Sequence, residues 1–141
     1  MLSLKRILYV EDNPDSVELI KFLLGCEDEN YVVSAAASAI EALHLMAETA
    51  FDLLIFDYKL PVMSGVELCL RVRETDRTTP ILFYTAMARP ADRALGLAAG
   101  ANDYLVKPND LDKLPKTVRN LLGRDSFIPS RQASVYKDRL W

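Results

Sequence analysis

The sequence is poor in the residues that build thiolate and imidazole sites, with 2 cysteines and 1 histidine among 141 residues. Cys26 and Cys69 stand in apolar helical segments, without Cys-x-x-Cys spacing and without a neighbouring group of histidines. They are therefore interpreted as small hydrophobic residues in a reducing compartment, not as a disulfide or as zinc ligands. His44 has no carboxylate partner in the local sequence and is given no role.

Long apolar runs and a strong excess of charge are also missing. No segment approaches the roughly 20 apolar residues of a membrane-spanning helix, and Lys5, Arg6 and Glu11 interrupt the stretch where a signal peptide would be apolar. The formal net charge of −3 disfavours direct contact of this chain with a nucleic-acid backbone. We therefore expect a cytoplasmic globular protein with no membrane segment and no direct DNA binding.

Apolar residues gather in five short runs rich in Ile, Leu, Val, Phe and Tyr, which predict strands. The runs are Arg6–Val10, Tyr31–Ala35, Leu53–Phe56, Ile81–Tyr84 and Tyr104–Val106. The first, third and fourth contain continuously apolar stretches, which are typical of central strands in a parallel sheet covered on both faces.

The segments between these runs carry apolar residues at helical spacing. These residues are Val17, Ile20 and Leu24; Ile40, Leu43 and Ala47; Val66, Cys69 and Leu70; Leu95 and Ala98 or Ala99; and Leu114, Val118, Leu121 and Leu122. Residue types favoured at helix ends support the assignment. The expected starts are Asn13-Pro14, Ser38 with Glu41 and Ser64 with Glu67, and the expected ends are Gly25 and Gly100. Pro115 either starts the last helix a turn later than Asp110 suggests or weakens its first turn.

Strands and helices alternate along the chain, and right-handed crossovers then give a doubly wound α/β sheet with helices on both faces. Such sheets carry their functional residues at the carboxyl ends of the strands. The pattern covers residues 4–123. Residues 124–141 mix Ser, Pro, Arg and isolated aromatics and are predicted to be a carboxyl-terminal tail or a truncated linker.

Polar residues end the predicted strands at this edge of the sheet. They are Glu11-Asp12 after the first strand, Asp57 after the third, Thr85 after the fourth and Lys107-Pro108 after the fifth. Ionised carboxylates about 5 Å apart repel by roughly 3 kcal/mol per pair at an effective dielectric constant of about 20, so three of them together require a cation. Oxygen ligands without His or Cys suit Mg²⁺, with Mn²⁺ as the alternative.

These residues predict phosphorylation of the protein itself. With the metal bound, Asp57 can attack phosphorus as a carboxylate nucleophile, while Lys107 and the cation offset charge on the transferring oxygens. The product would be an acyl phosphate. Thr85 can donate a hydrogen bond to the new phosphoryl group, and that contact can drive a conformational switch.

Four segments resemble the receiver domain of bacterial response regulators. They are Leu8–Asn13, Phe56–Gly65, Tyr84–Ala86 and Asp103–Pro108. Their joint presence in this order is highly specific, and the resemblance covers roughly residues 4 to 123. It implies a flavodoxin-like fold, a doubly wound sheet of five parallel strands in the order 2-1-3-4-5 with helices on both faces.

The resemblance also implies a role for each site residue. Asp57 would be the phosphoacceptor, Glu11 and Asp12 the acidic metal pair, Lys59 a metal ligand through its backbone carbonyl, Lys107 the partner of the phosphoryl oxygens, and Thr85 and Tyr104 the switch pair. The switch would alter the face formed by the fourth helix, fifth strand and fifth helix. Glu11 departs from the commoner pair of aspartates, and its longer side chain would act through a metal-bound water.

The implied phosphoryl donor is a histidine kinase or a phosphotransfer protein, and the implied output is a downstream protein that binds the switch face. The chain would be a single-domain regulator in a two-component system or phosphorelay. It would promote its own Mg²⁺-dependent phosphorylation and dephosphorylation without turnover of an external substrate. The kinase, the output partner and the choice between monomer and homodimer are left open.

Other functions fit the residues less well. A pure interaction module of the same fold would have lost site residues, and all of them are present here. A flavodoxin-like cofactor carrier needs a phosphate-binding loop where Glu11 and Asp12 would repel the phosphate. A phosphatase with an aspartate nucleophile would want a second Asp where Lys59 stands. Each site residue alone also has an ordinary role, as a turn aspartate, a solvated lysine or a packed strand residue, but their joint placement favours function.

Overall fold

The computed structural model describes residues 3–123. Five parallel strands are connected by helices. The elements are β1 (Lys5–Val10), α1 (Pro14–Glu27), β2 (Tyr31–Ala36), α2 (Ala39–Glu48), β3 (Leu53–Phe56), α3 (Gly65–Arg73), β4 (Ile81–Thr85), α4 (Pro90–Ala98), β5 (Asp103–Val106), the 3-10 turn η1 (Leu111–Lys113) and α5 (Leu114–Gly123). The sheet order β2-β1-β3-β4-β5 confirms the predicted fold class.

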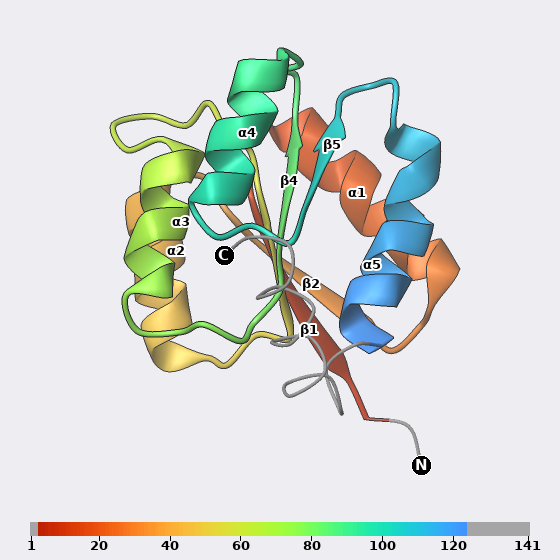
Figure 1. Ribbon diagram of the computed structural model, residues 1–141. Helices are drawn as coiled ribbons and strands as arrows, with labels where there is room; N and C mark the ends of the chain where they lie inside the picture. Colours follow the sequence, from red (N-terminus) through yellow and green to blue (C-terminus); the bar gives the residue numbers. More distant parts are fainter. Residues whose placement is uncertain (1–2, 124–141) are drawn as a thin grey trace.

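Helices cover both faces of the sheet (Figure 1), with α1 and α5 on one face and α2, α3 and α4 on the other. Successive residues of a strand point to opposite faces. In β1, Ile7 and Tyr9 therefore pack against α1 and α5, whereas Leu8 and Val10 pack against the other layer, and all four are fully buried. The strands run upward in Figure 1, so their carboxyl ends meet at the top edge of the sheet.

Several apolar residues at the predicted helical spacing are exposed. Ile40, Leu70 and Leu95 fit the helical pattern but have 45%, 51% and 53% of their surface exposed. On α2 the buried residues are Ala39 and Ala42, an i, i+3 pair on one side of the helix. The small residues, and not Ile40, therefore face the sheet on this helix.

The three predicted helix starts are confirmed, but only one of the two serine caps belongs to a complete capping box. The Asn13 side chain accepts hydrogen bonds from two backbone N–H groups in the first turn of α1. Ser64 and Glu67 form a complete capping box at α3. At α2 the Ser38 hydroxyl accepts from the Glu41 N–H, but the Glu41 carboxylate accepts from the amide that precedes Ser38, so this box is not reciprocal.

The predicted helix ends are partly right. Gly100 follows α4 with φ of 121°, a backbone conformation that favours glycine, as expected. Gly25 does not end α1, because the helix continues until Asp28 takes an extended backbone. Pro115 lies in the first turn of α5, after η1, so that helix begins later than Asp110 suggested. No helix within residues 3–123 combines the length and apolar character needed to cross a membrane.

Candidate functional site

Three carboxylates meet at the carboxyl edge of the sheet. Strands β1 and β3 are paired with Val10 opposite Phe56, so the residues that follow these two strands are neighbours. Glu11, Asp12 and Asp57 can each offer one oxygen such that all three oxygens lie within 4.8 Å of one another. Glu11 and Asp57 are buried, whereas Asp12 is exposed. The sequence predicted this convergence from strand ends alone.

Glu11 is held by donors on both of its oxygens. Its Oε2 accepts a hydrogen bond of 3.0 Å from the Asn13 N–H, and its Oε1 accepts one of 3.1 Å from the Tyr9 hydroxyl. The Lys107 ammonium also donates to Oε1. Burial raises the pKa of Glu11, and the charge of Asp57 acts in the same direction against the hydrogen bonds from Lys107 and Asn13.

Asp57 has one oxygen occupied by backbone donors and one turned toward a lysine. Its Oδ1 accepts hydrogen bonds from the N–H groups of Tyr58, at 2.7 Å, and Lys59, at 3.4 Å. Its Oδ2 lies 3.4 Å from Lys107 Nζ. The two oxygens therefore differ, and Oδ2 is the one beside a cation.

The loop after Asp57 passes very close to the start of α3. The Gly65 N–H donates a 2.8 Å hydrogen bond to the Tyr58 carbonyl. A Cβ atom at Gly65 would lie 2.0 Å from the backbone oxygen of Asp57, which is a severe overlap. The absence of a side chain at this position is therefore required by the fold of the loop that presents Asp57.

Lys107 links the carboxylates to the end of β5. Its Nζ contacts Glu11 and Asp57 and lies 5.5 Å from the centre of the Tyr84 ring, within the range of a cation–π contact. Its backbone N–H donates a 2.8 Å hydrogen bond to the Thr85 carbonyl. The sequence placed Lys107 beside Asp57, but it did not predict the pairing with Glu11.

Thr85 and Tyr104, the predicted switch pair, contact the same backbone unit. The Tyr104 hydroxyl donates a 2.7 Å hydrogen bond to the Met87 carbonyl, and the Met87 N–H donates one of 3.3 Å to Thr85 Oγ1. Burial raises the pKa of Tyr104 to about 12, so its hydroxyl stays protonated and remains a donor. Arg93 from α4 donates to the Tyr104 carbonyl, which joins α4 to β5.

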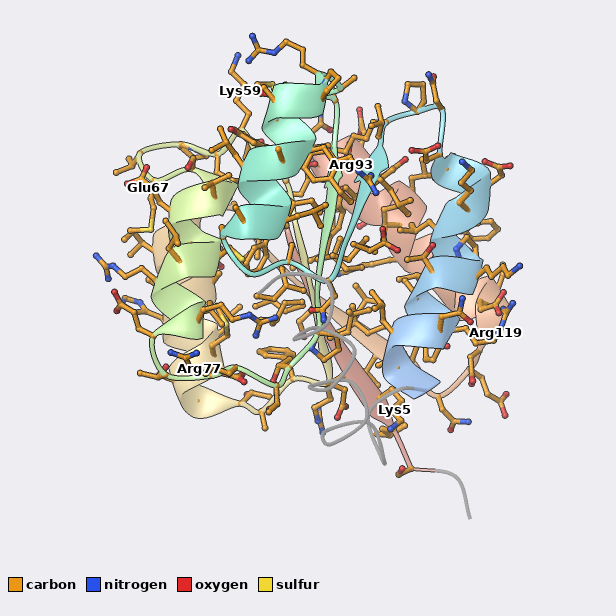
Figure 2. The ribbon with its side chains drawn as sticks, viewed as in Figure 1. Lys5, Lys59, Glu67, Arg77, Arg93 and Arg119 are labelled. Carbon is orange, nitrogen blue, oxygen red and sulfur yellow. The ribbon has the colours of Figure 1, made fainter. Side chains whose placement is uncertain are left out.

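Lys59 has an exposed side chain, which Figure 2 shows beside α4 at the carboxyl edge. Its backbone N–H faces Asp57. The role of its carbonyl as a metal ligand stays a prediction.

Sequence reasoning missed several contacts of the site. The Tyr9 hydroxyl, the Asn13 N–H, the Tyr84 ring and the Met87 backbone each touch a predicted site residue. Of these contacts, the sequence could have indicated only that of Tyr9. This residue stands two positions before Glu11 at the end of one strand, and side chains at i and i+2 share a face.

The donors of the acidic cluster fit a hard cation. They are carboxylate oxygens without a thiolate or imidazole among them, and like charges held this close are unfavourable without a neutralising ion. Mg²⁺ and Mn²⁺ prefer such oxygen donors.

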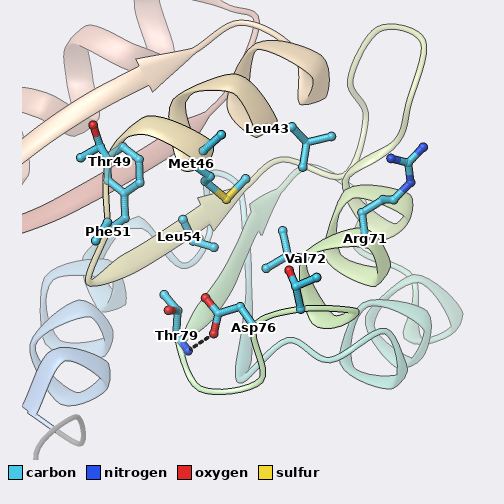
Figure 3. A pocket seen from close by; sticks show the side chains of 12 residues that line it. Leu43, Met46, Thr49, Phe51, Leu54, Arg71, Val72, Asp76 and Thr79 are labelled. Atoms are coloured by element: carbon cyan, nitrogen blue, oxygen red, sulfur yellow. Dashed lines mark hydrogen bonds between the residues drawn. The ribbon is translucent and has the colours of Figure 1, made fainter.

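A pocket lies at the opposite, amino edge of the sheet (Figure 3). It is formed between α2 and α3, with Leu43, Met46, Phe51, Leu54 and Val72 among its apolar walls. None of the predicted site residues lines it. The candidate site is therefore the acidic edge and not this pocket.

Comparison with known proteins agrees with the geometry. A family model described as the response regulator receiver domain matches residues 7–119. The transcriptional regulatory protein TrcR of Mycobacterium tuberculosis is 39% identical over 123 residues, which cover 87% of this chain and 47% of TrcR. The chain thus spans about half the length of the first curated relatives it matches.

For two further matches, this chain aligns with most of the other protein's length. An uncharacterised 14.6 kDa protein of Leptolyngbya boryana is 44% identical over 115 residues, which cover 80% of this chain and 86% of that protein. The receiver domain of the sensor histidine kinase PA1611 of Pseudomonas aeruginosa, solved with a magnesium ion coordinated in its active-site cleft, superposes with a TM-score of 0.76. That pair shares 32% identity and covers 86% of this chain and 99% of the other.

Proposed function

Because this chain belongs to the response regulator receiver domain family of two-component systems, we propose that it accepts a phosphoryl group on Asp57 from a histidine kinase or a phosphotransfer protein. One observation carries the proposal. The buried Asp57 carboxylate has Oδ1 held by backbone N–H groups and Oδ2 turned toward the Lys107 ammonium, within a cluster of acidic oxygens.

Asp57 acts as the nucleophile in this proposal. Its Oδ2 forms the new bond to phosphorus while the P–N bond of a phosphohistidine donor breaks, and the departing imidazole takes up a proton. The backbone bonds to Oδ1 fix the plane of the carboxylate. Lys107 offsets the negative charge that accumulates on the phosphoryl oxygens. Water then attacks phosphorus, the bond from phosphorus to Oδ2 breaks, and inorganic phosphate leaves the restored Asp57 carboxylate. In this proposal the protein promotes its own phosphorylation and dephosphorylation and turns over no other substrate.

Mg²⁺, with Mn²⁺ as a substitute, would be held by Glu11, Asp12, Asp57 and the Lys59 carbonyl. The cation supplies charge neutralisation at the transferring phosphoryl group. The oxygen-only donor set supports this assignment. The magnesium named for the PA1611 receiver domain supports it independently.

The switch that we propose runs through Met87. A phosphoryl group on Asp57 offers Thr85 a charged acceptor in place of its contact with the Met87 N–H, and charge-assisted hydrogen bonds are roughly twice as strong as neutral ones. Release of Met87 would also change the carbonyl that now accepts from Tyr104. Because the ring of Tyr104, a residue of β5, packs against Gly96 of α4, the surface of α4, β5 and α5 would change with it.

We propose that residues 4–123 form the receiver domain and that its output is contact with a downstream protein through the surface of α4, β5 and α5. The predicted tail, residues 124–141, lies outside the described residues. TrcR is named a transcriptional regulator, but about half of it is not matched by this chain. The net charge of −3 supports output through protein contact rather than direct DNA contact by this chain. A cytoplasmic location follows from this function and is part of the proposal.

The test is intact mass after incubation with Mg²⁺ and acetyl phosphate or phosphoramidate. The wild type should gain one phosphoryl group, and the gain should vanish with EDTA and in Asp57→Asn. Asp76→Asn, which alters an aspartate at the opposite edge of the sheet, should keep the gain. An unchanged gain in Asp57→Asn would assign the phosphoacceptor elsewhere. No gain in a folded wild type, followed by no transfer from candidate kinases, would favour an interaction module that is never phosphorylated.

A further inference from the structure

Tyr9 is a fully buried tyrosine in β1 whose hydroxyl contacts the acidic cluster. Its ring packs in the apolar layer between the sheet and helices α1 and α5. Its hydroxyl donates a 3.1 Å hydrogen bond to Glu11 Oε1. A tyrosine hydroxyl carries its proton at neutral pH, so it is available to donate this hydrogen bond.

The same Glu11 oxygen is shared with Lys107. A buried carboxylate oxygen that loses its donors bears a large cost. If Lys107 turns toward a phosphoryl group on Asp57, Tyr9 is the donor that still holds this oxygen. A phenylalanine at this position would fill the same apolar space but could not do so.

Glu11 has more freedom than an aspartate would have, because its side chain has one more rotatable bond. Asn13 holds Oε2 from the loop, and Tyr9 holds Oε1 from the strand below. Two donors on opposite sides fix the carboxylate with respect to Asp12 and Asp57, whichever way Lys107 points.

We propose that Tyr9 is a positioning residue for the metal site: its hydroxyl fixes the Glu11 carboxylate in the orientation that binds Mg²⁺. This inference rests on the proposed function, since it concerns the same site. Tyr9 touches neither the phosphoryl group nor the metal and acts through Glu11. It also accounts for how a glutamate serves at this position, since an aspartate would be too short to need the tyrosine.

The test is a titration of isotopically labelled protein, residues 1–141, with MgCl₂, followed by backbone amide chemical shifts. Tyr9→Phe should raise the Mg²⁺ dissociation constant by about tenfold or more, the size expected for one hydrogen bond to a charged group. Tyr31→Phe is the matched control, because Tyr31 packs against the same apolar layer at the far end of β2. It should leave the dissociation constant unchanged.

A double-mutant cycle separates positioning from general packing. In Glu11→Asp the carboxylate is one methylene shorter and is drawn out of hydrogen-bond reach of the tyrosine. Adding Tyr9→Phe to that variant should then change the dissociation constant by less than about twofold. If Tyr9→Phe raises the Mg²⁺ dissociation constant equally in the wild type and in Glu11→Asp, the inference is overturned and Tyr9 has only a packing role.

The outcomes also separate this inference from the proposed function. A wild type that binds Mg²⁺ while Tyr9→Phe binds it equally well overturns the role of Tyr9 alone. A wild type that binds no Mg²⁺ overturns both. Thermal unfolding in EDTA checks that each variant is folded, and the rate of phosphorylation by acetyl phosphate should fall in Tyr9→Phe at low Mg²⁺ and recover at saturating Mg²⁺.

Discussion

The two edges of the sheet use carboxylates in opposite ways. At the carboxyl edge, Glu11 and Asp57 are buried among like charges, and burial raises the pKa of Glu11. At the amino edge, Asp76 Oδ1 accepts hydrogen bonds of 3.0 Å from the N–H groups of both Thr78 and Thr79. Figure 3 shows the bond from Thr79. Partial burial acts to raise the pKa of Asp76, but these hydrogen bonds and the charge of Arg73 outweigh it and lower the pKa.

The basic side chains of the two edges, Arg73 and Lys107, also differ in the partners that they contact. At the amino edge Arg73 donates to the carbonyls of Gly100 and Asp76 and to the Asn102 side chain, so it ties α3 to the start of β5. At the carboxyl edge Lys107 contacts two carboxylates. The amino edge is saturated by fixed backbone partners, whereas the carboxyl edge keeps charges that a metal and a phosphoryl group can satisfy.

The largest expected effect comes from removing the cation at each edge. Lys107→Met should slow phosphorylation by acetyl phosphate by about 100-fold or more, because charge on the transferring oxygens is no longer offset. Arg73→Met should leave this rate within about twofold, yet lower the free energy of unfolding by roughly 1 to 2 kcal/mol, because part-buried backbone acceptors lose their donor. Phosphorylation time courses and urea unfolding measure the two quantities. Equal rate losses in both variants would remove the distinction between the edges.

Glycine substitutions should show how tightly the Asp57 loop is built. Gly65→Ala should lower the free energy of unfolding by about 1 to 3 kcal/mol, because its Cβ overlaps the Asp57 backbone. Gly25→Ala is the control, since nothing lies within 4 Å of a Cβ at that exposed helical position. It should stabilise the protein by about 0.5 to 1 kcal/mol. Urea unfolding distinguishes the two, and a stable Gly65→Ala protein would mean that the loop can relax.

Metal binding should stabilise the folded protein, and the gain should depend on the carboxylates of the carboxyl edge and not on those of the amino edge. At Mg²⁺ tenfold above its dissociation constant, the wild type should gain about 1.4 kcal/mol of unfolding free energy. Asp12→Asn should lose most of this gain, because one metal ligand is removed, while Asp76→Asn should retain it. Thermal unfolding with and without Mg²⁺ tests this, and a gain that survives in Asp12→Asn would move the ion to another site.

Acidification should remove the contribution of Asp76 to the free energy of unfolding, which is the smallest of the effects expected here. A lowered folded-state pKa means that the ionised Asp76 stabilises the protein above the unfolded-state value of about 3.9, and that this contribution is lost as the pH falls through the folded-state pKa. The difference in unfolding free energy between wild type and Asp76→Asn should be below about 1 kcal/mol at neutral pH. It should shrink toward zero as the pH falls below the unfolded-state value and through the lowered folded-state pKa. A difference that grows as the pH falls would contradict the sign.

The sequence was informative wherever a function depends on where a strand ends. The meeting of Glu11, Asp12 and Asp57 follows from apolar runs and the geometry of parallel sheets, whereas the order of the strands was expected from the resemblance to receiver domains. It was less informative where a side chain can choose between partners. The bond between Lys107 and Glu11 joins residues 96 positions apart and depends on rotamers that no local pattern specifies.

Helix faces show the same limit. Ile40 fits the apolar spacing of α2 but is exposed, whereas its smaller neighbour Ala39 is buried. Gly25 was read as a helix end, but neighbouring packing carries the helix past a single glycine whose cost is about 1 kcal/mol. In both cases tertiary contacts outweigh a local preference.

The carboxyl edge should respond to ligands while the amino edge stays fixed. Amide chemical shifts on addition of Mg²⁺ and beryllofluoride, a phosphoryl analogue, test this contrast directly. We expect large shifts at residues 10–13, 57–60, 85–88 and 104–107 and little change at residues 76–79 and 100–102. No shifts at the first set, or equal shifts at both, would contradict this contrast.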